Sequence, residues 1–268
     1  MNHSKTVLIT GASGGLGQSL VRIFNNHGFR LIATDIVKPD LTDINGIPGI
    51  FFIQADVTDS ADVARLKAEA ALEETGIDIL ICAAGIYDTY PVTEADPALF
   101  RHMIEVNVLG TVNMVQGMLN PLIKNKGRVI VVSSESYKIQ ALFQPYMITK
   151  ASLEAYCLSA RQELSLKDVS LTVIRPGAIN TPLLNWMKNK VPKEMYPVFG
   201  DEFEAGYLES LKLVGKLTPP DVVAGKIFKA AISRNPKRVY RINNNPLLRI
   251  ASLLPGSVLE KIIKSKFS

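Results

Sequence analysis

The hydrophobic pattern changes its period repeatedly along the chain. Short apolar runs of strand length alternate with longer segments whose apolar residues recur every three or four positions, as on one face of a helix. The predicted strands are residues 6–9, 30–34, 50–54, 78–82, 128–132, 170–174 and 238–242. Predicted helices begin at about residue 15 and cover residues 60–74, 97–123 and 220–233, and another carries Tyr146 and Lys150. This alternation predicts an α/β fold in three layers, with a parallel sheet between two layers of helices.

A glycine-rich stretch joins the first predicted strand to the first predicted helix. It reads Thr10-Gly11-Ala12-Ser13-Gly14-Gly15-Leu16-Gly17. Glycine lets the backbone turn tightly and lets a large anion approach it closely. The helix that follows directs free N–H groups and the positive end of its dipole at that anion. The stretch predicts a site for the pyrophosphate of a dinucleotide; a glycine-rich turn that binds no nucleotide is the alternative.

The second predicted strand ends at Asp35, 18 residues after Gly17. At this spacing a dinucleotide site places a carboxylate against the hydroxyls of the adenosine ribose. A carboxylate repels the 2′-phosphate of NADP, and neither Ser13 nor Ile36 supplies a compensating cation. We therefore expect NAD(H) as the cofactor, with an ordinary strand-end acid as the alternative for Asp35.

Two further positions place polar groups where the apolar pattern leads one not to expect them. Asp56-Val57 follows the third strand, where a carboxylate can hydrogen-bond an adenine ring; an ordinary turn acid fits the spacing equally well. Asn107 lies inside a predicted helix, where asparagine is unfavourable. It indicates either a helix break or an amide that binds a backbone carbonyl and holds a water.

Hydroxyl groups and an amine follow the fifth strand. Ser133 and Ser134 come at its carboxyl end, where open α/β sheets bind ligands. Tyr146 and Lys150 are four residues apart and share one helix face. A lysine cation beside a phenol favours the phenolate, so the pair can take a proton from an alcohol or give one to a carbonyl. Taken alone, the spacing fits a surface pair without chemistry equally well.

The segment from residue 183 to 217 combines much apolar bulk with no strong strand pattern. Its large apolar residues include Leu183, Leu184, Trp186, Met187, Met195, Tyr196, Phe199, Phe203 and Tyr207. They predict either a lid that walls a pocket for a lipophilic substrate or ordinary core packing. The tail, residues 243–268, is basic and amphipathic and is interrupted at Pro255-Gly256. We expect it to pack against protein, with an anionic membrane surface as the second interpretation.

Composition narrows these expectations. With 268 residues, 47% of them hydrophobic, the chain suits one large domain, residues 1–242, with residues 243–268 as an extension of it. The net charge of +5 is uneven: from Lys226 onward ten Lys or Arg face one acid, leaving −4 for the rest. No recognition motif accompanies that charge, so we expect no nucleic-acid partner.

The rarer residue types and the ends of the chain add three expectations. Two cysteines, in apolar segments, favour a reducing, cytoplasmic location. Three scattered histidines argue against a metal site. The first residues show no signal peptide, and no apolar run is long enough for a membrane span.

Residues about 5–242 resemble the short-chain dehydrogenases/reductases. The resemblance is carried, in the order of that family, by Thr10-Gly11-x-x-x-Gly15-x-Gly17, Asp56-Val57, Asn107, Ser133-Ser134, Tyr146-x-x-x-Lys150 and Pro176-Gly177. It implies a Rossmann-type, doubly wound parallel sheet of about seven strands. It also implies hydride transfer between a nicotinamide and an alcohol/carbonyl pair, in a homodimer or homotetramer.

The resemblance implies a role for each matching residue. The general acid/base falls on Tyr146, and Lys150 would lower the pKa of its phenol and hold the nicotinamide ribose. Asn107 would help to hold a proton-relay water, and Thr181 would contact the nicotinamide carboxamide. Together with the spacing arguments, it predicts that the cofactor contacts Gly11, Ser13, Gly15, Leu16, Gly17, Asp35, Asp56, Val57, Ala84, Gly85, Tyr146, Lys150, Pro176, Gly177, Ile179 and Thr181.

Two departures from the family pattern affect the predicted site. The usual Asn-Asn-Ala-Gly reads Cys82-Ala83-Ala84-Gly85, so cofactor contact there is expected to fall to backbone groups. The substrate-orienting serine normally lies 13 residues before the tyrosine, whereas Ser134 lies 12 before Tyr146 and Ser133 lies 13 before it. We assign the role to Ser134, because it stands at the strand end with its hydroxyl free to face the crevice.

The sequence therefore predicts an NAD(H)-dependent, metal-free alcohol dehydrogenase or ketoreductase. The apolar segment at 183–217 favours a bulky lipophilic substrate, such as a hydroxysteroid, a retinoid-like or a fatty alcohol. The alternatives are a reductase of small polar carbonyls and a non-catalytic NAD-binding sensor or scaffold. An extended-type epimerase or dehydratase fits less well, because its glycine spacing differs.

Overall fold

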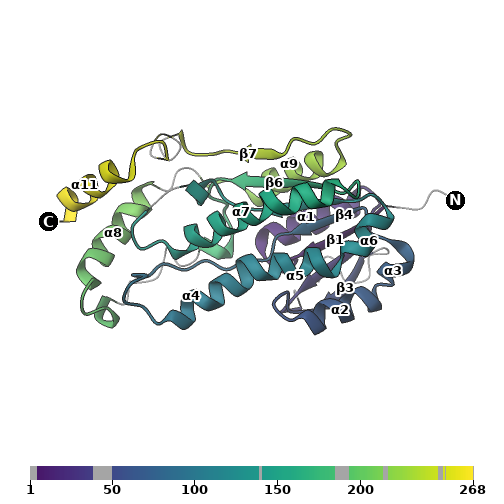
Figure 1. The fold of residues 1–268 in the computed structure, drawn as a ribbon, viewed down its shortest axis with the longest axis horizontal. Helices are drawn as coiled ribbons and strands as arrows, with labels where there is room; N and C mark the ends of the chain where they lie inside the picture. Colours follow the sequence, from purple (N-terminus) through teal and green to yellow (C-terminus); the bar gives the residue numbers. More distant parts are fainter. Residues whose placement is uncertain are drawn as a thin grey trace.

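A seven-stranded parallel sheet forms the centre of the protein (Figure 1). The structure, a computed structural model, describes residues 5–38, 50–138, 141–184, 193–213, 217–246, 250 and 252–267. The strands are β1 (Thr6–Thr10), β2 (Arg30–Asp35), β3 (Ile50–Gln54), β4 (Ile79–Cys82), β5 (Arg128–Val132), β6 (Ser170–Pro176) and β7 (Val239–Ile242). Their order is β3-β2-β1-β4-β5-β6-β7. The strand order reverses between β1 and β4, so both carboxyl ends open onto one crevice. The predicted fold is confirmed.

Helices cover both faces of the sheet. They are α1 (Gly15–Asn26), α2 (Ser60–Glu69), α3 (Leu72–Thr75), α4 (Pro97–Ile104), a π-helical turn (Glu105–Leu109), α5 (Gly110–Gly117), α6 (Leu119–Lys124), α7 (Pro145–Ser165), α8 (Gly200–Leu213), α9 (Pro220–Ile232) and α11 (Gly256–Phe267). Short 3-10 turns occupy Glu135–Lys138 and Lys193–Met195.

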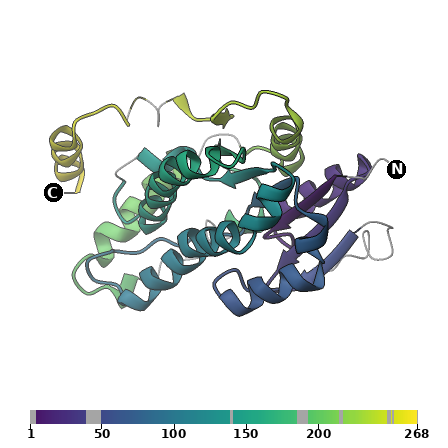
Figure 2. The same cartoon turned by 45° about the vertical axis from the view of Figure 1, so that its right-hand side comes forward.

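Two apolar cores lie on opposite faces of the sheet. On one face α1 packs on α9, and Leu20, Phe24 and Ile227 are fully buried against β1 and β2. On the other face α2, α5 and α7 cover Leu80 and Val129 of the central strands. Figure 2 shows α5 and α7 running side by side over that face. Burial on both faces explains why the strands read as continuous apolar runs.

Two predicted helices are broken in the structure, so both predictions were wrong in their continuity. The helix expected over residues 60–74 divides at Ala70 and Ala71, and Ala71 has the left-handed backbone angle φ of 49°. The helix expected over residues 97–123 changes to a π-helical turn around Asn107 and ends one segment at Met118. A π-turn inserts one extra residue and redirects the side chains that follow.

The turn between β1 and α1 is held by very close backbone contacts. Gly11 has a φ of 68°, and a β-carbon there would lie 2.7 Å from the amide nitrogen of Ala84. A β-carbon on Gly17 would lie 2.0 Å from the carbonyl oxygen of Gly11. Glycine is therefore required at both positions for α1 to begin directly against the turn.

We expect Gly17→Ala to destabilise the cofactor-free protein by about 1–3 kcal/mol, because the methyl group must displace the Gly11 carbonyl. Gly225→Ala is the matched control: no atom lies within 4 Å of the new β-carbon, and the site is inside α9. That variant should gain up to about 1 kcal/mol from helix propensity. Urea unfolding measures both values, and equal effects from the two substitutions would contradict the steric argument.

Candidate active site

The glycine turn and Asp35 meet at the carboxyl ends of β1 and β2. The Asp35 carboxylate accepts a hydrogen bond from the backbone N–H of Ser13 at 2.9 Å, and the Ser13 hydroxyl donates to the carbonyl of Val37. Arg30 stands at the opposite end of β2 and donates to the carbonyl of Ala70. The acid predicted from spacing thus lies beside the glycine turn.

The first turn of α1 fits an anion. Its N-cap residue, Gly14, makes no side-chain cap hydrogen bond, and the turn carries no acidic residue. Free amide groups and the positive end of the helix dipole therefore face the crevice. Across it, the side chain of Thr181 lies 2.9 Å from where a β-carbon on Gly15 would stand, so the loop after β6 approaches the turn closely. These residues fit a dinucleotide phosphate.

The other residues predicted to bind the cofactor stand on both sides of this turn. One carboxylate oxygen of Asp56, Oδ1, accepts hydrogen bonds from the N–H and hydroxyl of Thr58, and Val57 is buried beneath Gly110; adenine contact by Asp56 stays a prediction. Leu16 packs on the α1 core. Pro176 ends β6, the Gly177 amide donates to Ile242, and Ile179 pairs with Thr218. Pro176 and Gly177 thus contact β7, and Ile179 packs against the core that contains Ala12 of the glycine stretch.

The residues that replace the usual asparagines are held by a threonine. Ala83 and Ala84 both donate their backbone N–H groups, at 3.1 Å, to the hydroxyl of Thr10. Cofactor contact through the backbone of this segment stays a prediction. The small side chains leave the backbone of Ala84 against Gly11.

Asn107 is fully buried and all of its amide hydrogen-bonding groups face protein. Its Oδ1 accepts from the N–H of Ile86 at 2.8 Å, and its Nδ2 donates to the carbonyl of Ile86 and to the hydroxyl of Thr149. The side chain therefore joins the loop after β4 to α7. It binds a backbone carbonyl, as one of the two alternatives expected, and the proton-relay water beside it stays a prediction.

The serine pair divides into two environments. The Ser134 hydroxyl lies 2.8 Å from the hydroxyl of Ser136 and hydrogen-bonds the phenol of Tyr146. The Ser133 hydroxyl is buried and has no hydrogen-bond partner among the described residues. Of the two serines, only Ser134 can therefore hydrogen-bond a substrate oxygen that also contacts the phenol of Tyr146.

Tyr146 and Lys150 lie on one face of α7. The Lys150 ammonium stands 5.4 Å from the centre of the Tyr146 ring, donates to the carbonyl of Val132 and is almost completely buried. Burial lowers the pKa of Lys150 to about 8. Burial also raises the pKa of Tyr146, and the hydrogen bond from Ser134 offsets part of that rise. At neutral pH this gives a protonated phenol beside a cation.

Aromatic side chains surround the phenol. The Tyr87 ring centre lies 4.7 Å from that of Tyr146, and the Tyr87 hydroxyl donates to Gln144 at 2.6 Å. A separate buried cluster packs against Tyr146; it contains Tyr90, Met103, Phe143, Tyr196, Phe203 and Tyr207. Three of these residues come from the segment at 183–217, so the described part of that segment packs as core next to Tyr146, and its role as a pocket wall stays a prediction. Trp186 and Met187 lie outside the described residues.

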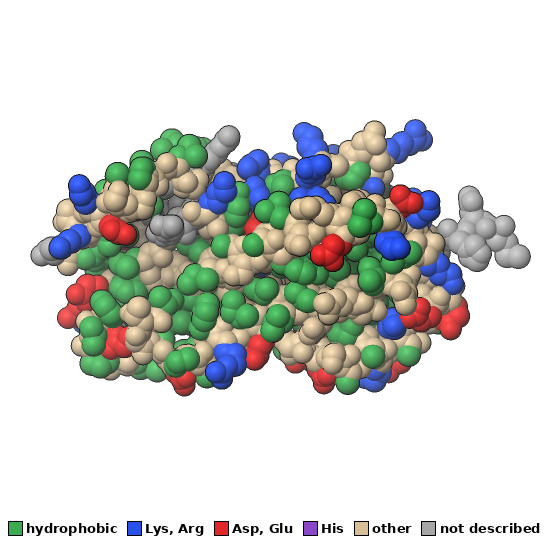
Figure 3. Space-filling model, in the orientation of Figure 1, with side chains coloured by type: hydrophobic (Ala, Val, Ile, Leu, Met, Phe, Trp, Pro, Cys, Tyr) green, Lys and Arg blue, Asp and Glu red, His purple; other side chains and the backbone are tan. Residues whose placement is uncertain are grey.

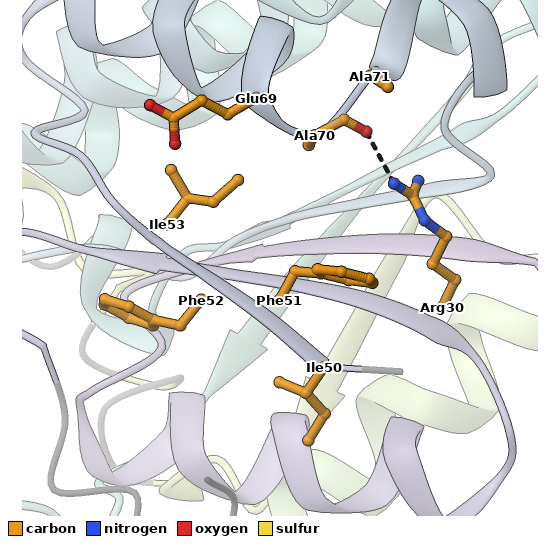
Figure 4. A pocket seen from close by; sticks show the side chains of 8 residues that line it. All are labelled: Arg30, Ile50, Phe51, Phe52, Ile53, Glu69, Ala70 and Ala71. Atoms are coloured by element: carbon orange, nitrogen blue, oxygen red, sulfur yellow. Dashed lines mark hydrogen bonds between the residues drawn. The ribbon is translucent and has the colours of Figure 1, made fainter. Parts of the chain in front are cut away.

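An open hollow lies elsewhere on the molecule. It is lined by Arg30, residues 50–53 and residues 69–71, beside the edge strand β3 (Figure 4). Arg30 and Ile50 begin their strands, so this hollow faces the end of the sheet opposite to Tyr146. In the described part of the chain no three metal-ligating side chains come together.

Comparison with known proteins identifies the family. The family model described as short chain dehydrogenase matches residues 5–191. Oxidoreductase UcpA of Salmonella typhimurium is 32% identical, with 95% of this chain and 96% of the relative covered. The chain belongs to the short-chain dehydrogenase family. It is an oxidoreductase of that family.

Other members of the short-chain dehydrogenase family are named for different substrates. Diacetyl reductase ((S)-acetoin forming) of Staphylococcus epidermidis is 28% identical, over 82% of this chain and 88% of the relative. Estradiol 17-beta-dehydrogenase 2 of Rattus norvegicus is 28% identical, over 98% and 75%.

Solved structures share the fold. A short-chain dehydrogenase from Streptomyces avermitilis superposes with a TM-score of 0.78 at 19% identity, with 99% of this chain and 95% of the other covered. One from Burkholderia cenocepacia, in complex with NADP, gives 0.75 at 23% identity and 97% coverage of both.

Thr10, which begins the glycine-rich stretch, and three residues that the sequence analysis did not single out position this short-chain dehydrogenase site. Thr10 holds the Ala83-Ala84 backbone, and Thr149 receives the Asn107 amide. Asn113 donates to the carbonyls of Val57 and Thr58. Gln144 is buried at the N-terminus of α7 and accepts a hydrogen bond from the hydroxyl of Tyr87. One signal was available: Thr149 lies inside the Tyr-x-x-x-Lys motif and Gln144 lies two residues before it.

We expect Lys150 to make the stability of the cofactor-free protein depend on pH. Its folded pKa, about 8, lies below the ordinary value of 10.5, so between these values the unfolded chain keeps a proton that the folded chain has lost. Stability from this residue therefore rises with pH across that window, by up to about 1.4 kcal/mol per pH unit. Below about pH 8 both states are protonated and the contribution is constant.

Urea unfolding of the wild type and Lys150→Met isolates this effect. The difference in unfolding free energy between the two proteins should shift in favour of the wild type from about pH 8 upward. Lys167→Met, at an exposed lysine after α7, should show no such trend. A flat difference for Lys150→Met would show that the ammonium is solvated in the folded protein.

Proposed function

We propose that this protein interconverts a secondary alcohol and a ketone with NAD(H) and without a metal. The observation that carries the proposal is the meeting of Ser134, Tyr146 and Lys150 at the carboxyl end of β5. They come together in the crevice that also contains the uncapped first turn of α1. A proton donor, an oxygen-orienting hydroxyl and an anion site in one crevice match alcohol/carbonyl chemistry.

The protein's own groups account for the proton transfer. In the reductive direction the protonated phenol of Tyr146 gives its proton from Oη to the substrate oxygen, and the Ser134 hydroxyl holds that oxygen. In the oxidative direction Oη takes the proton back. The Lys150 cation, held by Val132, stabilises the phenolate that forms in between. Asn107 and Thr149 hold α7 against the loop after β4, which sets the position of both groups.

The cofactor residues fit a nicotinamide dinucleotide. The pyrophosphate would bind at the glycine turn and the first turn of α1, and the backbone of Ala84 and Gly85 would line the nicotinamide side. When bound, the nicotinamide supplies or accepts the hydride. A β-carbon on Gly85 would lie 3.1 Å from Asn107 and 3.9 Å from the Lys150 ammonium, so glycine keeps this edge of the crevice open.

A bulky apolar substrate is supported by the aromatic cluster beside Tyr146. The rat relative named estradiol 17-beta-dehydrogenase 2 agrees with this class. A reductase of small carbonyls is the second candidate, and the relative named diacetyl reductase favours it. A panel of steroid, aliphatic and small diketone substrates, followed by NADH absorbance, separates the two.

Turnover of the preferred substrate should fall by about 10²–10⁴-fold in Tyr146→Phe, because the proton donor is removed. NADH binding, followed by fluorescence, should persist. Tyr156→Phe is the control, since Tyr156 lies on the same helix but packs against the core between α7 and the sheet, away from the aromatic cluster beside Tyr146. Turnover retained in Tyr146→Phe would support a non-catalytic NAD-binding protein instead.

NAD should be preferred over NADP, because the Asp35 carboxylate lies against Ser13, where it would repel a 2′-phosphate, and Arg30 stands at the opposite end of β2. Asp35→Ser should weaken NAD binding about tenfold or more, through loss of a charge-assisted hydrogen bond. The substitution should also reduce the preference for NAD over NADP, measured as the ratio of the two dissociation constants. A structurally similar short-chain dehydrogenase was solved with NADP, so either cofactor is compatible with this fold. Tighter binding of NADP than of NAD by the wild type would overturn the assignment.

We also propose an oligomeric state and a cellular location for this protein. Self-association as a dimer or tetramer is supported by exposed apolar residues on α7, among them Ile148 and Leu158. A cytoplasmic location is supported by Cys82 and Cys157, which are buried and unpaired. Light scattering and cell fractionation test them.

A further inference from the structure

The tail carries an exposed apolar surface that the proposed reaction does not use. Leu253 is 79% exposed, Ile250 60% and Ile262 49%. These residues, with Leu254 and Val258, form what we call the tail patch. Three of them, at positions 254, 258 and 262, follow one another at helical spacing along α11 and the turn before it. Figure 3 shows hydrophobic side chains gathered at the upper left, over the segment between β7 and α11.

The opposite face of α11 holds the helix to the protein. The Lys266 ammonium pairs with Glu209 of α8, and the Phe267 ring reaches to within 3.6 Å of a β-carbon position on Gly206. Leu259 and Ile263, on that inner face, are half-buried. Figures 1 and 2 both place α8 and α11 at the end of the molecule away from the N-terminus. The tail patch is therefore a second apolar face, presented outward by a docked helix.

Charge decides what can cover this face. Lys261 is exposed beside Ile262, and α11 carries three lysines, at positions 261, 264 and 266, against one acid, Glu260. A symmetric dimer through the patch would bring the same basic residues of two copies together. An anionic lipid surface instead supplies opposite charge to the lysines and an apolar layer to the patch.

We propose that the tail patch binds an anionic lipid bilayer at its surface. The α11 helix has 12 residues, far fewer than the roughly 20 that a span requires. Within the part of the chain that the structure describes, no helix is both long and apolar enough to cross a membrane. The patch therefore lies on the bilayer, and its contact with α8 turns that end of the molecule toward the lipid.

Vesicle sedimentation of the full chain tests the proposal. The wild type should sediment with vesicles of phosphatidylcholine mixed with phosphatidylglycerol, and only weakly with phosphatidylcholine alone. High salt should weaken the binding, because it screens the lysines. Leu253→Asp and Ile262→Asp should each lower the affinity by about tenfold or more. Lys261→Gln should lower it by about fivefold, the loss expected for one cation near an anionic surface.

Matched variants separate the patch from general effects. Leu166→Asp changes a leucine that is 82% exposed at the end of α7 and should bind as the wild type does. Circular dichroism should show unchanged helix in all variants, since every substituted side chain is exposed. The proposal would be overturned if the wild type sedimented with neither kind of vesicle, or if the patch variants bound the vesicles with wild-type affinity. So would a change from dimer to monomer in Leu253→Asp, which would assign the patch to a second copy. None of these readouts depends on catalysis.

Discussion

The close approach of α1 to the turn after β1 is the constraint on which the site depends. The carbonyl of Gly11 occupies the space that a side chain on Gly17 would need. This contact lets α1 begin at the strand end, with its free amides in the crevice between β1 and β4. The hydroxyl of Thr10 then holds the Ala83-Ala84 backbone against the same turn. The anion site at the start of α1 and the backbone that lines the crevice are consequently both fixed by the same turn after β1.

The proton-transfer groups depend on a buried polar network that a lone helix could not provide. Asn107 binds both backbone groups of Ile86 and reaches Thr149 on α7. The π-helical turn allows this by directing Asn107 inward from an otherwise regular helix. On the far side of α7, Glu154 forms a bidentate ion pair with Arg175 at the end of β6. Because buried polar groups are costly when unpaired, both connections restrict where α7 can lie.

The outer part of the molecule is joined to the site in steps. The aromatic cluster connects α8 to Tyr146, and α11 rests on α8 through Phe267 and Lys266. The half of each of these helices that faces protein is apolar. On the outward side of α11, Val258 and Ile262 are exposed beside Lys261, so this side of the helix also presents apolar surface that a partner could cover.

Much of this arrangement was predictable from the chain alone. The period of the apolar residues determined seven strands and their helical connections, because buried strands and one-sided helices have different repeats. Short-range spacing likewise determined the glycine turn, the acid after β2 and the Tyr146–Lys150 pair. Strand ends in a parallel sheet meet at one edge, so these local signals also placed the crevice.

Only the tertiary structure decided contacts between segments far apart in sequence. It placed Ser134 rather than Ser133 beside Tyr146, gave an Asp56 carboxylate oxygen to Thr58, and joined the amide of Asn107 to Ile86 and Thr149. It also broke two helices, at Ala71 and at Asn107, where neighbouring elements outweigh local propensity. Periodicity reports which face of an element is apolar. It does not report which partner that face meets, and the partner determines each polar contact.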